Sequence, residues 1–348
     1  MRAVCWARIA SSVPMGQQVH ESALRGALQR ELGPDWLIAD VALLPLRASR
    51  GSGRRLPLRL VWASPYSIAA RTGSLVYRGA DLVHRLELRC PPSRGREIVT
   101  VHDLAPLRFA DEGCLPRWAA ESARKAAAVI CGSEFAAEEV RHLLGVRRAH
   151  VVPSGVDPRW AEAEPLSAEE LARAGLHEPL VVHAGGATLR KNLDALAGAW
   201  PEVAAEYPDA LLALCGPPHR RRHELFGSLP NVRFLGYADR SFVIRLMRTA
   251  TVVVVPSTYE GFGLPPLEAM AAGALVVAAA RGALLEVCGD VAILVEPTAH
   301  GVAGGILEAL TGGPDVERRR AEGRQRASSY TWERAAHATA ALYEEAVA

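Results

Sequence analysis

Short apolar runs separated by helical segments most constrain what this chain of 348 residues can fold into. The runs are nearly continuous in Val, Ile, Leu and Ala, as is typical of strands that are buried on both faces of a parallel sheet. The predicted strands are Ala3–Ile9, Leu37–Leu44, Leu58–Trp62, Leu82–Leu86, Ile98–Val101, Ala128–Cys131, His150–Val152, Leu180–His183, Ala210–Cys215, Val232–Leu235, Thr251–Val255, Ala274–Ala278 and Ala292–Val295. Helices are expected between them, for example over Gln17–Glu31, Glu134–Leu144, Lys191–Glu206 and Pro265–Ala272. The pattern predicts a doubly wound α/β fold.

The length suits two domains better than one ordinary core. A segment rich in Glu, Ala and Pro, Pro158–Pro179, separates two predicted strands, and we place the interdomain boundary there. We therefore predict an N-terminal Rossmann-like domain over residues 1–160 and a C-terminal one over 161–331. An amphipathic helix is expected over 332–348.

The hydropathy of the chain and the spacing of its cysteines indicate the cellular compartment in which the protein is found. No run of eighteen uncharged apolar residues occurs, so no segment is predicted to span a bilayer. Arg8 interrupts the apolar run near the N-terminus, which argues against a signal peptide. The six cysteines lie far apart with no Cys-x-x-Cys pair, which argues against a zinc site and for a reducing compartment. A cytoplasmic location is expected.

Charge is distributed unevenly along the chain. The formal net charge is +2, but up to Asp157 the basic residues exceed the acidic ones by seven. A basic N-terminal half could attract an anionic acceptor or the inner face of an anionic membrane, while a merely solvated face fits the sequence equally well. The arginine-rich segment Ala48–Arg55 is expected to be an exposed loop. No nucleic-acid partner is expected.

Ligands of open parallel sheets bind beyond the carboxyl ends of the strands, so the residues that follow each strand are the candidates for a site. After the strand at Leu180, a Gly185-Gly186 turn leads to Arg190 and Lys191, which are expected to open the next helix. Glycines let a ligand approach the backbone, and a helix N-terminus with two cations favours an anion. The segment predicts a pyrophosphate clamp, although two solvated cations after a glycine turn are a common structural feature. The patterns of a P-loop and of a dinucleotide-binding loop are absent.

A second candidate is the loop and helix start that follow the strand at Thr251. Glu260 lies in a glycine-rich loop and Glu268 in the first turns of the next helix, with seven residues between them. Both carboxylates are expected to accept hydrogen bonds from sugar or ribose hydroxyls. The backbone amides of Gly261, Phe262 and Gly263 are expected to donate to a ligand. Solvated glutamates are the structural alternative.

Two weaker candidates lie in the N-terminal half. His102 and Asp103 follow the strand at Ile98 directly, where a His-Asp pair suits acid–base chemistry or a purely structural role. Gly16, in the segment Ser11–Gln18 between the first strand and helix, would suit an anion or an acceptor.

Together these motifs closely resemble glycosyltransferase family 4, whose members are retaining enzymes with the GT-B fold of two Rossmann-like domains that face each other across a cleft. PSTYEGFGLPPLEAMAAG is similar to the E-x7-E signature of that family, and LRKNLDAL to its phosphate-binding Arg-Lys-Asn. The remaining likenesses are VTVHDLAPLRF to its His-Asp strand end, SEFAAEEV and VVPSGVD to N-domain signatures, LLEVCGDVAILVEP to its late strand, and SYTWERAAHATAALYEEA to its C-terminal helices.

The resemblance implies a nucleotide-sugar donor, GDP-mannose or a UDP-sugar, and a glycan, lipid-linked or small-molecule acceptor. It implies that the terminal helix returns to the N-terminal domain and that displacement occurs on the front face with retention. Metal-dependent glycosyltransferases commonly use an Asp-x-Asp pair, which this chain lacks, so neither a metal nor a cofactor is expected.

The resemblance also implies roles for individual residues. The implied roles are diphosphate binding for Arg190 and Lys191, ribose binding for Glu268, sugar contact for Glu260 and His102, a place near the diphosphate for Gly16, and ligand contacts for Asp103, Gly185, Gly186, Gly261, Phe262, Gly263 and Leu264.

Three positions depart from the family pattern. Gly16 stands alone where many members have a Gly-Gly pair, and Gly186 stands where some have an arginine, so that Arg190 must serve instead. Leu284-Leu285-Glu286-Val287 replaces the common Leu-Pro-Glu-Val.

Other functions remain compatible with the same fold. A sugar-nucleotide epimerase and a pyridoxal-phosphate-dependent phosphorylase are the enzymatic alternatives, although the phosphorylase needs a Schiff-base lysine and the chain has only Lys125 and Lys191. The third alternative is a non-catalytic, glycosyltransferase-like partner subunit. Such subunits usually lose donor-site residues, which this chain retains.

Overall fold

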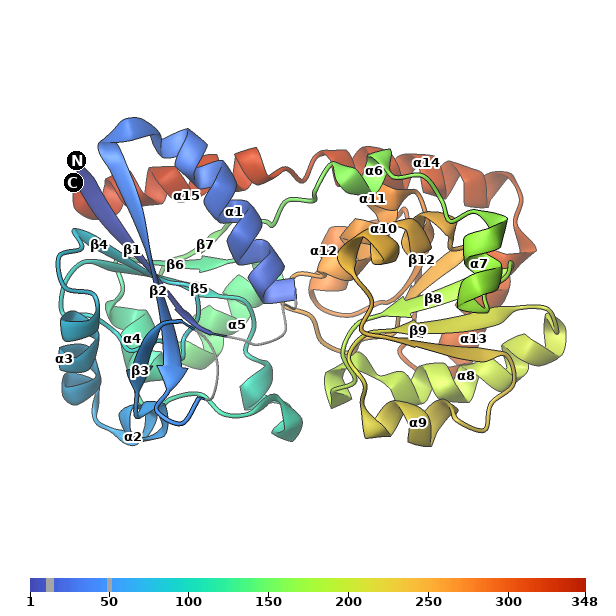
Figure 1. The fold of residues 1–348 in the computed structure, drawn as a ribbon, viewed down its shortest axis with the longest axis horizontal. Coiled ribbons are helices and arrows are strands. Elements are labelled where there is room, and N and C mark those ends of the chain that lie inside the picture. Colours follow the sequence, from blue (N-terminus) through green and yellow to red (C-terminus); the bar gives the residue numbers. More distant parts are fainter. Residues whose placement is uncertain (11–15, 49–51) are drawn as a thin grey trace. The chain divides into compact units, whose positions relative to one another are not determined.

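The computed structural model describes residues 1–10, 16–48 and 52–348. They form two α/β units, shown in Figure 1. The first unit comprises Met1–Gly155 and Thr331–Ala348, and the second comprises Val156–Tyr330. The first stretch of this unit ends at Gly155, before the boundary predicted at residue 160, and the terminal helix belongs to the same unit.

The first unit contains a parallel sheet of seven strands in the order β3-β2-β1-β4-β5-β6-β7. Its strands are β1 (Arg2–Ile9), β2 (Trp36–Pro45), β3 (Arg54–Leu56), β4 (Leu82–Arg85), β5 (Glu97–Val101), β6 (Ala128–Cys131) and β7 (Ala149–Val151). Its helices are α1 (Gly16–Leu32), α2 (Leu58–Ala63), α3 (Tyr66–Val76), α4 (Ala119–Lys125), α5 (Glu134–Leu144) and α15 (Trp332–Val347).

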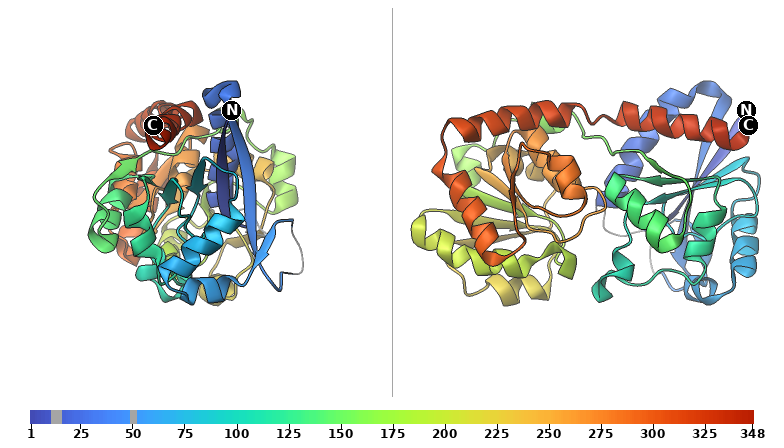
Figure 2. Two further views of the ribbon diagram at one scale, coloured as in Figure 1. Left: turned by 90° about the vertical axis from the view of Figure 1, so that its left-hand side faces the viewer. Right: turned by 180° about the vertical axis from the view of Figure 1, so that it is seen from behind.

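Successive residues of the strands pack into different cores because side chains alternate between the faces of a sheet. Val4 and Trp6 pack with α1 and α15 on one face, whereas Cys5 and Ala7 pack with α2 and α3 on the other. Figure 2 shows α1 and α15 side by side on this first face.

The second unit contains a parallel sheet of six strands in the order β10-β9-β8-β11-β12-β13. Its strands are β8 (Leu180–Ala184), β9 (Leu211–Cys215), β10 (Val232–Gly236), β11 (Val252–Val255), β12 (Leu275–Ala279) and β13 (Ile293–Val295). Its helices are α6 (Arg159–Glu162), α7 (Ala168–Ala174), α8 (Leu193–Glu206), α9 (Arg220–Phe226), α10 (Arg240–Thr249), α11 (Leu264–Ala272), α12 (Ala283–Cys288), α13 (Ala299–Thr311) and α14 (Pro314–Ser328). Helices α8 and α13 share a core with one face of the sheet, and α10 and α11 share a core with the other.

Twelve of the thirteen predicted strands occur, with ends that differ by at most one residue. The prediction for Leu58–Trp62 was wrong, because this run forms helix α2. Leu58 and Val61 are buried three residues apart, and Leu60 is 72% exposed, which is the period of a helix and not of a buried strand. The short strand β3 was not predicted; it lies partly in the predicted loop Ala48–Arg55, of which residues 49–51 lie outside the described residues.

The terminal helix α15 is fixed to the first sheet by a buried chain of hydrogen bonds. The Trp6 indole donates to the Tyr343 hydroxyl at 2.7 Å, and that hydroxyl lies 2.6 Å from Nδ1 of His84. Nε2 of His84 lies 2.8 Å from the Thr100 hydroxyl. Burial lowers the pKa of His84 to about 3, so the ring is neutral. The Tyr343 hydroxyl can therefore accept from Trp6 and donate to Nδ1 of His84, whose Nε2–H then donates to Thr100.

In the part of the chain that the structure describes, no helix combines the length and the apolar composition needed to cross a bilayer. The six cysteines are free thiols, and five of them are buried.

Candidate active site

The central site candidates of the second unit lie where the strand order of its sheet reverses. Strands β8 and β11 are parallel neighbours, although Leu180 and Val252 are far apart in the sequence. The segments that follow them, Gly185–Lys191 and Glu260–Leu264, therefore leave the same edge of the sheet next to each other. Such a reversal is the usual place for a ligand in an open α/β sheet.

Arg190 and Lys191 lie in a 3-10 turn, Leu189–Lys191, that precedes α8. The helix predicted from Lys191 begins at Leu193, because Asn192 adopts a left-handed conformation with a φ of 51°. The Asn192 amide donates to the carbonyls of Pro256 and Pro297, both at 3.0 Å. These bonds attach the turn to the residues that follow β11 and β13. They thereby fix the backbone from which the side chains of Arg190 and Lys191 extend.

The carboxylate of Glu260 joins both cations. Lys191 Nζ donates to Glu260 Oε1 at 2.6 Å, and Arg190 Nη1 donates to Glu260 Oε2 at 2.8 Å. Glu260 is 6% exposed. Burial by itself would raise the pKa of this carboxyl, but the charges of Lys191 and Arg190 outweigh it and hold the pKa at about 2. The cluster therefore carries two positive charges and one negative charge at neutral pH.

Glu268 has a different electrostatic environment from Glu260. Its carboxylate lies on α11, with Oε1 3.8 Å from Arg240 Nη2, which also lies 3.9 Å from Asp157 Oδ2. These distances exceed that of a hydrogen bond, and among the described residues none donates to Glu268. Burial raises the pKa of Glu268 to about 7, with Arg240 opposing the rise and Asp157 adding to it. A hydroxyl group could therefore find an acceptor here.

The loop between the two glutamates turns at Gly263, whose φ of +108° suits glycine. A Cβ at this position would also lie 3.2 Å from the Leu284 side chain. Leu264 begins α11 and is followed by two prolines, which need no hydrogen bond in a first turn. Phe262 packs edge to face against Tyr330, with ring centroids 5.9 Å apart.

The candidates of the first unit gather around His102. The ring of His20, on α1, lies edge to face with that of His102 at 5.0 Å and is held by Ser154, whose hydroxyl lies 2.9 Å from its Nδ1. Nε2 of His102 is buried and has no hydrogen-bond partner among the described residues. Burial lowers the pKa of His102, although Asp103 and Glu87 oppose this. His102 is therefore neutral near pH 7 and presents an unused acceptor.

Asp103 and Gly16 take less prominent positions. Asp103 accepts a hydrogen bond from the backbone of Ala105 at 3.0 Å, which makes it a turn residue in this structure. Gly16 is exposed at the first turn of α1. The remainder of the predicted segment before it, residues 11–15, lies outside the described residues.

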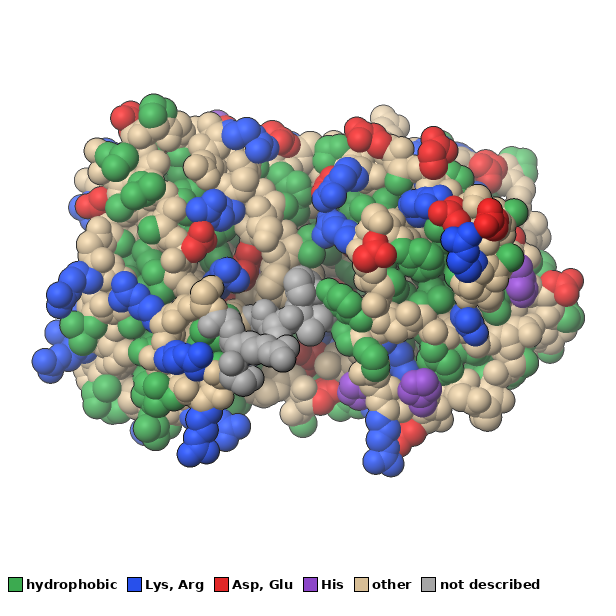
Figure 3. Space-filling model, in the orientation of Figure 1, with side chains coloured by type: hydrophobic (Ala, Val, Ile, Leu, Met, Phe, Trp, Pro, Cys, Tyr) green, Lys and Arg blue, Asp and Glu red, His purple; other side chains and the backbone are tan. Residues whose placement is uncertain are grey.

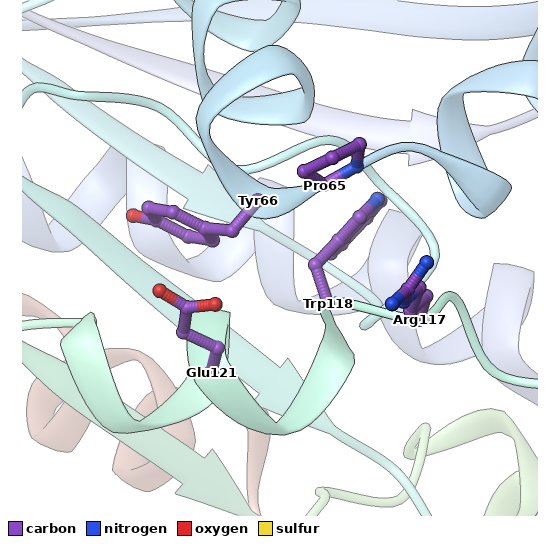
Figure 4. Close-up of a pocket in the computed structure, with 5 residues that line it drawn as sticks. All are labelled: Pro65, Tyr66, Arg117, Trp118 and Glu121. Carbon is purple, nitrogen blue, oxygen red and sulfur yellow. The ribbon is translucent and has the colours of Figure 1, made fainter.

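A hollow of about 230 Å³ elsewhere in the first unit contains none of the predicted site residues. Figure 4 shows that the Tyr66 ring and the Glu121 carboxylate face it, with Pro65, Arg117 and Trp118 beside them.

Comparison with known proteins identifies the family. Residues 50–160 match the model described as Glycosyltransferase Family 4, and residues 167–326 match the model described as Glycosyl transferases group 1. The GDP-mannose-dependent alpha-(1-6)-phosphatidylinositol dimannoside mannosyltransferase of Mycobacterium tuberculosis is 32% identical over 284 residues, which cover 74% of this chain and 71% of that protein. The chain belongs to glycosyltransferase family 4.

Solved structures confirm the GT-B fold expected for such a glycosyltransferase. Sucrose-phosphate synthase from Thermosynechococcus elongatus matches with a TM-score of 0.79 and 20% identity over 99% of both chains. The Anabaena protein HepE in complex with UDP-glucose matches with a TM-score of 0.76 and 17% identity over 99% of this chain and all of that one.

The glycosyltransferase fold brings together Arg190, Lys191 and Glu260 by direct contact, with Glu268 on the adjoining helix α11. His102, Asp103 and Gly16 belong to the first unit. Among the described residues, no three His, Cys, Asp or Glu side chains are grouped as metal ligands.

Three neighbours of these groups were not predicted from the sequence: His20, Arg240 and Arg222. His20 and Arg240 sit on helices whose contacts no motif indicates. Arg222 lies in a run of three arginines shortly after the carboxyl end of β9, and that run could have drawn attention to it.

Proposed function

We propose that this glycosyltransferase takes its sugar from a nucleotide-sugar donor whose diphosphate binds at the cluster of Arg190, Lys191 and Glu260. The observation that carries the proposal is the pairing of both cations with one buried carboxylate at the strand-order reversal. Lys191 has three N–H donors, and its one hydrogen bond to a described residue is to Glu260, so two donors are left for phosphate oxygens. Glu260 fixes the cations in place before a ligand arrives, which avoids reorganisation when negative charge develops.

The other residues of the second unit suit the rest of a nucleotide sugar. The Glu268 carboxylate, without a hydrogen-bond donor among the described residues, suits ribose hydroxyls. The Gly263 turn and the start of α11 suit the sugar and phosphate. GDP-mannose is the first donor to test, because the mycobacterial relative is named for it, and UDP-glucose is the second.

We propose retention of configuration without a strong protein base. As the bond between the anomeric carbon and the phosphate oxygen breaks, Arg190 and Lys191 stabilise the departing diphosphate. The acceptor hydroxyl attacks from the same face and passes its proton to the departing oxygen. His102 accepts a hydrogen bond from a sugar hydroxyl through Nε2, since burial keeps the ring neutral.

Transfer assays with a panel of nucleotide sugars test the donor. Release of GDP from GDP-mannose, or of UDP from UDP-glucose, should be measured together with isothermal titration of GDP and UDP. Binding of neither nucleoside diphosphate at millimolar concentration would contradict a diphosphate site.

We also propose that the first unit binds an anionic membrane through α2 and α3, where a lipid-linked acceptor would be found. Residues 41–80 contain seven arginines and no acidic residue. Leu60, Ile68 and Leu75 are 72%, 55% and 57% exposed on these helices. In Figure 3 the corresponding side of the first unit shows Lys and Arg side chains among hydrophobic ones. A surface of this kind suits the interface of anionic lipids.

Sedimentation with vesicles tests this contact. Binding to phosphatidylglycerol vesicles should exceed binding to phosphatidylcholine vesicles and should weaken when Arg59, Arg71 and Arg78 are replaced by Gln. Equal binding to both vesicle types would contradict the proposal, and it would leave the donor assignment intact.

A further inference from the structure

Arg222 is a buried cation that has no acidic partner among the described residues. The residue is 3% exposed, in the first turn of α9. None of the ion pairs formed by the described residues includes it, whereas its neighbours Arg220 and Arg221 pair with Glu224 and Asp194. Burial lowers the pKa of the Arg222 guanidinium.

Within residues 1–10, 16–48 and 52–348, the guanidinium donates only to backbone carbonyl groups. Nη1 donates to Pro217 at 2.7 Å, and Nη2 donates to Gly185 and, at 3.2 Å, to Gly186. Gly216 makes room for it, because a Cβ there would lie 2.7 Å from Nη2 and 2.0 Å from the Gly185 carbonyl oxygen. Arg222 is thus packed directly against the backbone of the Gly185-Gly186 turn.

Local stability does not explain this charge. Burying a guanidinium without a counter-ion is unfavourable, and a cation in the first turn of a helix also opposes the helix dipole. A neutral donor would satisfy carbonyl groups without either cost. The positive charge must therefore have another use.

The contacts of Arg222 also orient two amide groups. The peptide bonds on either side of Gly186 are trans. In each of these peptide groups the N–H therefore points opposite to the carbonyl of the preceding residue. Because both carbonyls point at Arg222, the N–H groups of Gly186 and Ala187 point away from it. Within the described part of the chain, neither N–H donates to a protein acceptor. A Cβ on Gly186 would meet no described atom within 4 Å, so there is room beside this residue.

We infer that Arg222 is a positioning residue for the donor diphosphate: it aims the Gly186 and Ala187 amides at a phosphate group and adds its own charge from behind the turn. Successive amides that converge on one side of a turn form an anion-binding concavity. The inference rests on the proposed function, because the anion it concerns is the diphosphate of the donor. Arg222 does not touch that anion and acts through the backbone that it holds.

Calorimetry on three variants separates this role from a structural one. In Arg222→Gln, the affinity for GDP should fall about tenfold to a hundredfold, because the charge behind the turn is lost and the two amides are no longer held toward the phosphate. The affinity for guanosine should stay unchanged. Arg222→Lys keeps the charge and should show a smaller loss. Arg220→Gln is the matched control, because Arg220 lies in the same turn with its side chain 90% exposed, and it should bind GDP normally.

The outcomes distinguish the two proposals. Unchanged GDP affinity in Arg222→Gln, or an equal loss for GDP and guanosine, would overturn the role of Arg222. Absence of binding of GDP and of UDP in the unaltered enzyme would instead overturn the proposed function. The same titrations are repeated with UDP and uridine if the enzyme prefers UDP.

A measurement on the unaltered protein covers the case in which Arg222→Gln does not fold. Titration with the nucleoside diphosphate, followed by amide NMR, should shift the Gly186 and Ala187 N–H resonances, and the nucleoside alone should not shift them. Saturating binding that leaves both resonances in place would overturn the inference.

Discussion

Lys191 Nζ lies 2.6 Å from Glu260 Oε1, so a lysine that follows one strand is held by a glutamate that follows a neighbouring strand. The pair joins the two segments that carry most of the second-unit candidates. Removing the positive charge of Lys191 is therefore the most direct test of the proposed diphosphate site.

Lys191→Met should weaken nucleoside diphosphate binding by about 1.5–3 kcal/mol, because one charge-assisted contact to phosphate is lost. The matched control is Lys125→Met, which removes the only other lysine, an exposed side chain paired with Glu121 at 2.8 Å. Isothermal titration with GDP and UDP measures both. Equal affinities in the two variants would remove Lys191 from the site.

Glu260→Gln should destabilise the protein at pH 7 by about 3 kcal/mol, because the neutral side chain loses the attraction of Lys191 and Arg190. The folded pKa of about 2 lies below the usual 4.5, so the charged carboxylate stabilises the fold above pH 4.5. That contribution is lost as the pH falls from 4.5 through 2. Urea unfolding at pH 7 and pH 3 measures the difference, and an equal deficit at both would contradict the ion-pair explanation.

The same substitution should lower kcat more than it lowers nucleoside diphosphate affinity, because Glu260 positions the cations and is assigned to the sugar.

Glu268→Gln should have the opposite effect on stability. The folded pKa of about 7 lies above the usual 4.5, so the protonated carboxyl is favoured in the fold and its contribution is lost as the pH rises from 4.5 through 7. The variant should therefore be more stable than the unaltered protein at pH 8, by about 1–3 kcal/mol, and nearly equal to it at pH 4. Denaturant titration at the two pH values checks this.

Donor affinity should move the other way in the same variant. Gln is a weaker acceptor than a carboxylate, so Glu268→Gln should bind the donor less tightly at pH 8. A variant that gains stability and keeps full donor affinity would remove Glu268 from the ribose site.

Much of this arrangement could be predicted from the sequence. Continuous apolar runs indicated the strands, and the rule that ligands bind beyond their carboxyl ends indicated the loops at Gly185 and Glu260. The pairing of Lys191 with Glu260 could not be predicted, because the two residues are 69 positions apart in the sequence. Whether their side chains reach each other depends on how the two strands are placed in the sheet. The same holds for Arg222, whose partners are carbonyl groups that leave no trace in side-chain patterns.

The helix at Leu58 shows a different limit. Its run, LRLVW, is interrupted by Arg59, just as the strand β10 is interrupted by Arg233. The exposure of Leu60 is what shows the helical period in the structure. A run of five residues is too short for periodicity to decide.

Catalysis should require no divalent metal. The proposed diphosphate site offers Arg190 and Lys191, which repel a cation and neutralise the leaving group themselves. Transfer activity should survive excess EDTA after metal stripping, measured as nucleoside diphosphate release. Loss of activity that Mg²⁺ or Mn²⁺ restores would show that the cationic site is not sufficient.

Tyr343→Phe should destabilise the protein by about 1–3 kcal/mol, because the Trp6 indole and the His84 ring would each lose a buried partner. The control is Tyr207→Phe, whose hydroxyl makes a single long contact with Thr311 at 3.4 Å on the surface. Thermal unfolding compares the two, and similar melting temperatures would mean that the buried hydroxyl contributes little.

The docking of α15 has a consequence for the order in which the protein can fold during translation. Ala335, Ala336 and Tyr343 complete the core of the first unit, yet the ribosome makes them after the whole second unit. While the second unit is being synthesised, α15 does not yet exist. The part of the first sheet that α15 later covers is therefore exposed to solvent during this time. The half of the enzyme made first is therefore finished last, and a nascent chain arrested before Thr331 would expose that face to chaperones and proteases.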